Sequence, residues 1–81
     1  MNTNTQLMQM ADSKAAVTGT YYGVAFVGKA ESSRQLWWGP DYPEELTIAL
    51  DAPITVFGGE TDRILIDARQ VDEHTHRVEV M

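Results

Sequence analysis

The sequence predicts an all-β protein: a small antiparallel barrel or sandwich of five to six short strands that follows a flexible or weakly helical N-terminal arm. Short apolar runs follow one another at a spacing of about ten residues, and Gly, Pro, Asp and Glu separate them. Apolar and polar residues alternate within several runs, as in strands with one buried face. The 81 residues suffice for one domain, so we expect an arm over residues 1–17 and a single β-domain over residues 18–81.

The arm is polar at first, then rich in methionine and then in alanine. Leu7, Met8, Met10 and Ala11 have the spacing of an apolar helical face over one or two turns. No capping sequence precedes them, and a helix this short is marginal by itself in water. We therefore expect the arm to be ordered only if it packs against another part of the protein.

The first strong strand runs from Gly19 to Ala30, where large side chains alternate with small ones. The polar residues 29–33 indicate a turn, and residues 34–38 indicate a returning strand that completes a hairpin. A glycine pair at 58–59 favours a second hairpin loop, because glycine readily takes positive φ. Further strands are predicted at residues 46–50, 54–57, 63–68 and 76–81.

Two tryptophans, Trp37 and Trp38, lead from the returning strand into a proline-containing loop. Successive residues of a strand face opposite sides, so both indoles cannot enter the same core. Trp38 shares a face with Leu36 and is the expected core residue. Trp37 is then exposed and is a candidate contact residue, since aromatic side chains often dominate binding energy. The alternative is that both rings cap opposite edges of the core.

The net charge of −6 is unevenly distributed along the chain. Residues 1–40 carry +1, whereas residues 41–81 carry ten carboxylates and three arginines, which give −7. This field repels a phosphate backbone and disfavours non-specific binding of DNA or RNA. Either the carboxylates only keep a small domain soluble, or they form an acidic face that docks onto a basic partner. The residues predicted for protein binding are Trp37, Tyr42, Glu44, Glu45, Asp62 and Asp72.

Aromatic residues in the first half of the chain support an alternative function. Small barrels of the OB, SH3-like and Sm-like kinds bind single-stranded nucleic acid by stacking bases on exposed aromatic rings. Tyr22 and Trp37 would supply such rings here, and Lys29 and Arg34 would supply cations beside them. The low density of lysine and arginine ranks nucleic-acid binding second.

No motif in the sequence indicates an enzyme. The chain has no cysteine, its serines lie outside any nucleophile elbow, and its glycine pair is not followed by the lysine of a phosphate loop. His74 and His76 would lie on one face of a strand, and such a pair is suited to binding zinc, nickel or iron. We favour two surface histidines over this metal site, and we expect no cofactor.

These features together predict a small, acidic, non-enzymatic protein-binding module. Its expected partner is a protein with a basic surface, which the chain would modulate or inhibit, such as a protein that handles nucleic acid. A short chain without disulfides gains stability by burying surface in an assembly, so we expect a homo-oligomer, most simply a homodimer. No apolar run of membrane-spanning length, no secretory start and no cysteine are present, and we therefore expect a cytoplasmic protein with no membrane partner.

Overall fold

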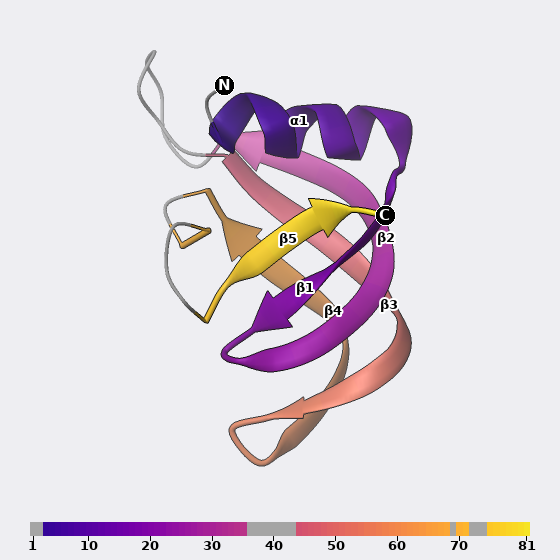
Figure 1. Ribbon diagram of the computed structural model, residues 1–81, viewed down its shortest axis with the longest axis vertical. Coiled ribbons are helices and arrows are strands. Elements are labelled where there is room, and N and C mark those ends of the chain that lie inside the picture. The colour runs from indigo at the N-terminus through magenta and orange to yellow at the C-terminus, as the bar shows by residue number, and fades with distance from the viewer. Residues whose placement is uncertain (1–2, 36–43, 69, 72–74) are drawn as a thin grey trace.

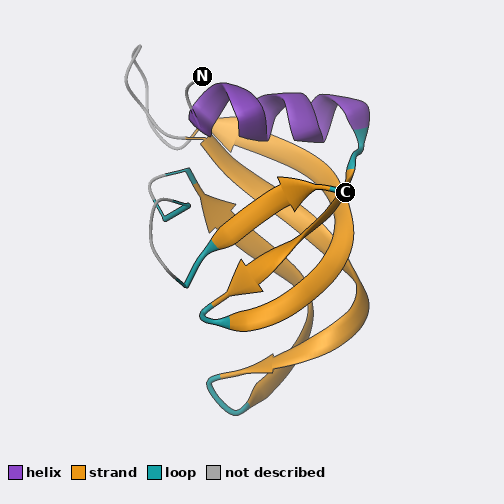
Figure 2. Cartoon of the chain, in the orientation of Figure 1, coloured by secondary structure: helices purple, strands orange, loops and turns teal. Residues whose placement is uncertain are grey.

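The computed structural model describes residues 3–35, 44–68, 70–71 and 75–81. In this part of the chain one helix precedes five strands (Figure 1), and strands account for most of the residues (Figure 2). The all-β prediction is therefore confirmed. No described helix is long and apolar enough to cross a membrane. The elements are α1 (Thr3–Ser13), β1 (Ala16–Tyr21), β2 (Val24–Gln35), β3 (Glu44–Val56), β4 (Gly59–Asp67) and β5 (Arg77–Val80).

The strands form one antiparallel sheet in the order β4-β3-β2-β1-β5. Strands β1 to β4 pair with their neighbours in the sequence, whereas β5 returns across the molecule to pair with β1. The long strands β2 and β3 bend strongly, so that the sheet curls around its inner face (Figure 1). Among the described residues the sheet ends at β4 on one side and at β5 on the other, so these two strands are its edges.

The inner face of the curled sheet holds the core. In β4, Ile64 and Ile66 are buried and Leu65 between them is exposed, which is the period of two expected of a strand with one buried face. Ile48 and Leu46 of β3 lie opposite Ile64 and Ile66 and are fully buried. Cross-strand packing of these branched side chains stabilises the β3–β4 pair.

Helix α1 covers one end of this core (Figure 1). Leu7, Met10 and Ala11 are buried at the spacing i, i+3 and i+4, whereas Met8 faces solvent. The helix packs on β2 and β3. The apolar spacing thus correctly indicated a helical face, and the segment is ordered because it packs on the sheet.

The helix ends in a Schellman motif, in which a residue with positive φ closes the last turn. Lys14 has a φ of 53°, and its N–H donates to the Ala11 carbonyl at 3.2 Å. The N–H of Ala15 donates to the Met10 carbonyl at 3.0 Å. The chain then enters β1 at Ala16, so the predicted boundary after residue 17 falls inside this strand.

The first hairpin turns earlier than the sequence predicts. The chain turns at Tyr22-Gly23, between β1 and β2, and not at residues 29–33. β2 continues through those polar residues and accommodates them with a bulge between Ala30 and Ser32. The predicted strand 19–30 is therefore two strands.

The second hairpin turns at Phe57-Gly58, one residue before the predicted glycine pair, and Gly59 already belongs to β4. The predicted strands 46–50 and 54–57 are parts of one long strand, β3. The register of β3 with β4 shifts between Ala49 and Ile54, which gives β3 extra residues at its bend. This bend brings the second turn to the same side of the molecule as the first (Figure 1).

Gly28 permits a close approach between β2 and β3. A Cβ atom at this position would lie within 3.0 Å of the Ala49 carbonyl oxygen and of Ile48 Cγ2. The position is buried and lies opposite Leu50 in the ladder. Only a residue without a side chain fits here without moving the strands apart.

Gly28→Ala is expected to lower the free energy of unfolding by about 1–3 kcal/mol, because two packed strands must separate. Urea unfolding followed by circular dichroism measures this loss. Gly59→Ala is the matched control, since a Cβ atom there would meet only the Val56 carbonyl oxygen, at 3.7 Å. Equal losses in the two variants would show that close approach at Gly28 is not the cause.

Candidate functional site

The two hairpin turns bring four aromatic side chains together. Tyr22 of the β1–β2 turn lies against Phe57 of the β3–β4 turn, with ring centroids 4.6 Å apart and an interplanar angle of 69°. The ring of His76, directly before β5, lies 4.4 Å from that of Tyr22. Tyr21 packs against Tyr22 at 4.8 Å and against His76 at 5.4 Å. We call these four residues the aromatic tip.

Both turns hold an aromatic residue in a backbone conformation that usually suits glycine or asparagine. Tyr22 has a φ of 49° and Phe57 a φ of 51°, and each is followed by a glycine, Gly23 or Gly58, with a φ of 78° or 75°. Two successive residues with positive φ are typical of the type I′ turn, which prefers Asn-Gly. A bulky residue in the left-handed region is strained by about 1–2 kcal/mol. Such strain is concentrated at functional sites in proteins.

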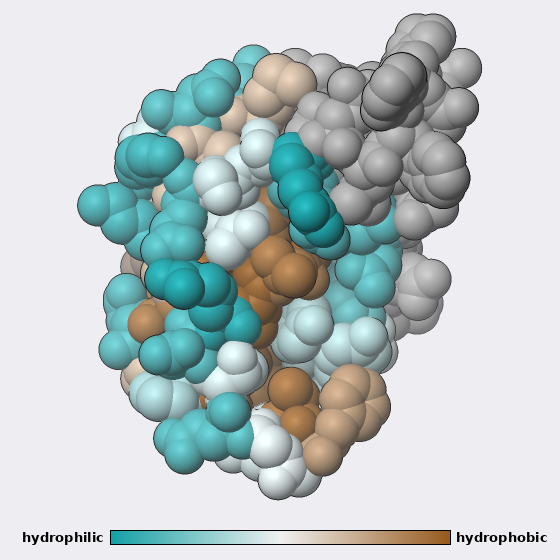
Figure 3. Space-filling view, turned by 180° about the vertical axis from the view of Figure 1, so that it is seen from behind, coloured by the Kyte–Doolittle hydropathy of each residue, from teal (hydrophilic) through white to brown (hydrophobic). Residues whose placement is uncertain are grey.

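The strained residues are also exposed. Phe57 is 83% exposed and Tyr22 is 43% exposed, so neither position is explained by the filling of a core. Apolar side chains are visible at the lower end of the molecule in Figure 3, where the β3–β4 hairpin lies. A large exposed ring on a rigid turn is a common anchor in protein interfaces.

His76 is the buried member of the aromatic tip, with 4% of its surface exposed. Its Nδ1 lies 2.9 Å from Thr75 Oγ1, and its Nε2 has no hydrogen-bond partner in the described part of the chain. His76 is thus not the surface histidine that the sequence favoured. Burial, and to a smaller extent the nearby Tyr22, raises the pKa of Tyr21 above its ordinary value of 10.0.

A metal centre is not formed by the residues that the structure describes. No three His, Asp or Glu side chains among them are arranged to hold a metal ion. His74 lies outside the described residues. The metal site at His74 and His76 therefore stays a prediction.

The hairpin that carries Phe57 is acidic. Asp51, Glu60 and Asp62 are exposed on β3 and β4, and none of them forms an ion pair within the described residues. We call these three residues the hairpin carboxylates. Glu60 and Asp62 line, beside Pro53, a shallow hollow of about 340 Å³. A negatively charged hollow on the same hairpin as an exposed ring suits the aliphatic stem and cationic head of lysine or arginine.

The described arginines are already paired with carboxylates. Arg34 Nε lies 2.9 Å from Glu45 Oε1, Arg63 Nη2 lies 2.9 Å from Glu31 Oε1, and Arg77 Nη2 lies 3.2 Å from Glu79 Oε1. Exposed pairs of this kind add little stability. They do, however, cancel the positive charge that binding to phosphate would require.

The residues predicted for protein binding are not brought together in the described part of the chain. Glu45 is paired with Arg34, whereas Asp62 is one of the hairpin carboxylates. Glu45 lies opposite Asp67, five residues along β4 from Asp62, or roughly 17 Å. Trp37, Tyr42, Asp72 and the side chain of Glu44 lie outside the described residues.

The residues predicted for nucleic-acid binding are also separated. Tyr22 is in the aromatic tip, Lys29 is exposed within β2, and Arg34 near the end of β2 is paired with Glu45. Neither cation belongs to the aromatic tip. Trp37, the second predicted stacking residue, lies outside the described residues.

Sequence reasoning missed Phe57, because it assigned this residue to a strand and the turn to the glycines that follow. One signal was available. Tyr22-Gly23 and Phe57-Gly58 are both aromatic–glycine pairs that precede a strand, and in both the aromatic residue has positive φ. Trp38-Gly39 is another aromatic–glycine pair in the sequence, and it lies outside the described residues.

Comparison with protein-family models, with curated proteins and with solved structures found no match to this chain. The functional proposal accordingly depends on the site itself. The two distinguishing features of the site are the strained, exposed rings of the aromatic tip and the hairpin carboxylates, which have no ion-pair partner among the described residues and lie on the hairpin that carries Phe57.

Proposed function

We propose that this chain is a non-enzymatic protein-binding module whose β3–β4 hairpin docks onto a basic surface of its partner. The observation that carries this proposal is Phe57, an almost fully exposed ring on a strained turn that packs against a second exposed ring, Tyr22. Rigid aromatic anchors bind with little loss of side-chain entropy. The hairpin carboxylates on the same hairpin supply charge for attraction and orientation.

The ring and the carboxylates have different roles in this contact. Phe57 provides apolar surface that becomes buried, which is the main source of affinity at an interface centre. The hollow beside Pro53, lined by Glu60 and Asp62, receives a lysine or arginine of the partner. Rim charges of this kind act chiefly on the association rate and are screened by salt.

The proposed partner is a protein that handles nucleic acid, because such proteins present basic surfaces to phosphate. By occupying that surface the chain would modulate or inhibit its partner. We further propose a partly open small barrel, supported by the bends of β2 and β3, and a cytoplasmic location, supported by the lack of cysteine.

The test is a pull-down from native lysate with the immobilised protein, at low and high salt, with and without nuclease. We expect a protein that is retained after nuclease treatment and released at high salt. Asp62→Lys should reduce its recovery at least about threefold, by repelling the basic surface. The matched control is Asp12→Lys, which changes the net charge equally at an exposed position of α1. Equal losses of partner recovery with both variants would show that the net charge of the chain, and not the position of Asp62 on the hairpin, governs binding.

The same experiment distinguishes the alternative function. Recovery of RNA or DNA that disappears with nuclease would indicate that Tyr22 and its neighbours stack on bases. Tyr22→Ala would then abolish the recovery of nucleic acid, and the protein-binding proposal would be replaced.

A further inference from the structure

The edge of the sheet at β5 presents backbone groups that no other described strand pairs with. The N–H of Met81 donates to the Ala16 carbonyl at 3.0 Å, so the odd-numbered residues of this segment direct their backbone groups toward β1. In an antiparallel pair these directions alternate along the strand. The N–H and C=O groups of Val78 and Val80 therefore point away from β1, to the side where the described sheet ends.

The other edge, at β4, is partly satisfied by its own side chains. The N–H of Asp67 donates to Gln70 Oε1 at 3.0 Å, and Thr61 Oγ1 donates to the Arg63 carbonyl at 2.8 Å. In the stretch from Arg63 to Asp67 the outward backbone groups thus belong to odd-numbered residues, and those of Arg63, in the middle of β4, and of Asp67, at its end, are engaged. Local hydrogen bonds of this kind protect an edge strand from pairing with another chain.

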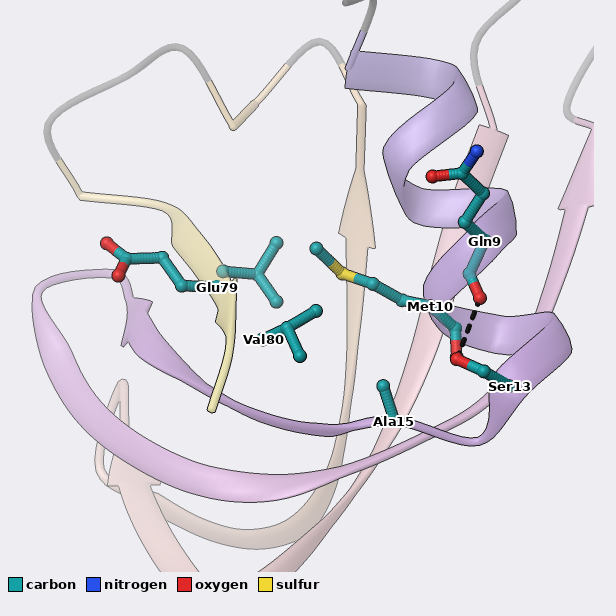
Figure 4. A pocket seen from close by; sticks show the side chains of 7 residues that line it. Gln9, Met10, Ser13, Ala15, Glu79 and Val80 are labelled. Atoms are coloured by element: carbon teal, nitrogen blue, oxygen red, sulfur yellow. Dashed lines mark hydrogen bonds between the residues drawn. The ribbon is translucent and has the colours of Figure 1, made fainter.

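An open groove runs beside β5. It has a volume of about 480 Å³ and lies between α1 and β5, with Met10, Ala15, Val78 and Val80 among its lining residues. Met10 reaches from the helix toward β5, while the side chain of Glu79, which also lines the groove, points away from Met10 (Figure 4). Val80 is 58% exposed, although its neighbour Val78 is buried. The groove therefore leaves β5 accessible between Val78 and Val80.

We propose that β5 pairs antiparallel with β5 of a second copy of this chain, across a twofold axis at Val78, to form a homodimer. Val78 and the partner's Val78 then exchange backbone hydrogen bonds, and the two sheets become continuous. Arg77 lies opposite the partner's Glu79, and by symmetry Glu79 lies opposite the partner's Arg77. Opposite charges at facing positions stabilise such a pair of strands.

The charges of Arg77 and Glu79 favour this register over the one in which the twofold axis lies one residue further along β5. A twofold axis at Glu79 would place Glu79 directly opposite the partner's Glu79, and facing like charges destabilise a strand pair. In the single chain Arg77 and Glu79 form only an exposed ion pair within one strand. Both side chains are therefore available to a second copy.

The side-chain pattern disfavours pairing of β5 with β4 of the second copy. Val78 of β5 directs its backbone groups outward and its side chain to the core face. Leu65 of β4 also directs its backbone groups outward, but its side chain faces solvent. Residues directly opposite in an antiparallel pair have side chains on the same face. Such a pairing would align the core face of one chain with the solvent face of the other. The β5–β5 dimer keeps the two core faces continuous and does not depend on the proposed hairpin function.

The first test is sedimentation of the full chain over a range of concentrations. We expect a dimer for the natural sequence. Arg77→Glu and Glu79→Arg should each raise the dimer Kd about tenfold, because each change creates two repulsive pairs. The double variant should restore dimerisation. A natural chain that remains monomeric, or a double variant without recovery, would overturn the proposal. Circular dichroism shows that each variant is folded.

The second test distinguishes the two edges. Val80→Pro removes an outward N–H of β5 and leaves the ladder with β1 unchanged, so the dimer should be lost. Leu65→Pro is the matched change at the edge of β4 and should leave the dimer intact. Loss of the dimer in Leu65→Pro alone would place the contact at β4. If Val80→Pro unfolds the chain, the single variants Arg77→Glu and Glu79→Arg and their double variant test the β5 contact instead.

Discussion

Phe57→Asn is expected to raise the free energy of unfolding by about 0.5–1 kcal/mol, because it relieves a strained turn, and to weaken binding of the proposed partner. Phe57 has a φ of 51°, which asparagine tolerates, and Asn-Gly is the preferred pair of a type I′ turn. Little buried surface is lost, since the ring is 83% exposed. Removal of an aromatic hot spot weakens binding by at least about 2 kcal/mol, or roughly 30-fold in Kd.

Urea unfolding measures the change in stability, and the pull-down measures partner recovery. Phe57→Ala is the control, because it also removes the ring but keeps a side chain that is disfavoured at positive φ. It should lose binding without the gain in stability. Phe57→Asn protein that still binds would exclude the aromatic tip from the contact surface. A fall in its stability would show that packing of Phe57 on Tyr22 outweighs the strain.

Leu7→Ala is expected to lower the free energy of unfolding by about 2–5 kcal/mol, as for other fully buried leucines. Leu7 is only 1% exposed and belongs to the core, although it lies in the segment that the sequence assigns to a flexible arm. Small domains have a total stability of about 5–15 kcal/mol, so this single change removes a large part of it. The expected result is a much lower midpoint of urea unfolding.

Met8→Ala is the matched control for this prediction. Met8 is the next residue of the same helix but is 44% exposed, so its truncation should change stability by less than about 0.5 kcal/mol. Far-ultraviolet and aromatic circular dichroism should report one common transition, because α1 and the sheet share a core. Similar small effects of both substitutions would mean that α1 contributes little to the folded state.

Several strands could be predicted from the sequence, because alternation with a period of two is a local pattern. The predicted segments 63–68 and 76–81 overlap β4 and β5, and the buried side chains of β4 are the apolar ones in phase, Ile64 and Ile66. The two turns could not be placed in this way. Local preferences favour the glycine pair at 58–59, whereas the chain turns with Phe57 at positive φ.

The candidate site was predicted only in part. Tyr22 and Asp62 were identified as binding residues, although for different functions, and both belong to the site. Glu45 was assigned to the acidic face but is paired with Arg34. Charge and residue type alone do not indicate which carboxylates have partners, because ion pairs form between segments that are distant in sequence.

The sequence by itself determined the all-β class, the apolar alternation that divides core from solvent, the acidic second half and the absence of cysteine. Only the tertiary structure decided that the arm becomes helix α1, that the turns lie at Tyr22 and Phe57, and that β5 is left as an open edge. Local patterns fix which face of a strand is buried. Contacts between remote segments supply the free energy that orders a short helix and holds aromatic residues at positive φ. The meeting of two turns therefore depends on the bend of β3 and on strand order, which no local pattern encodes.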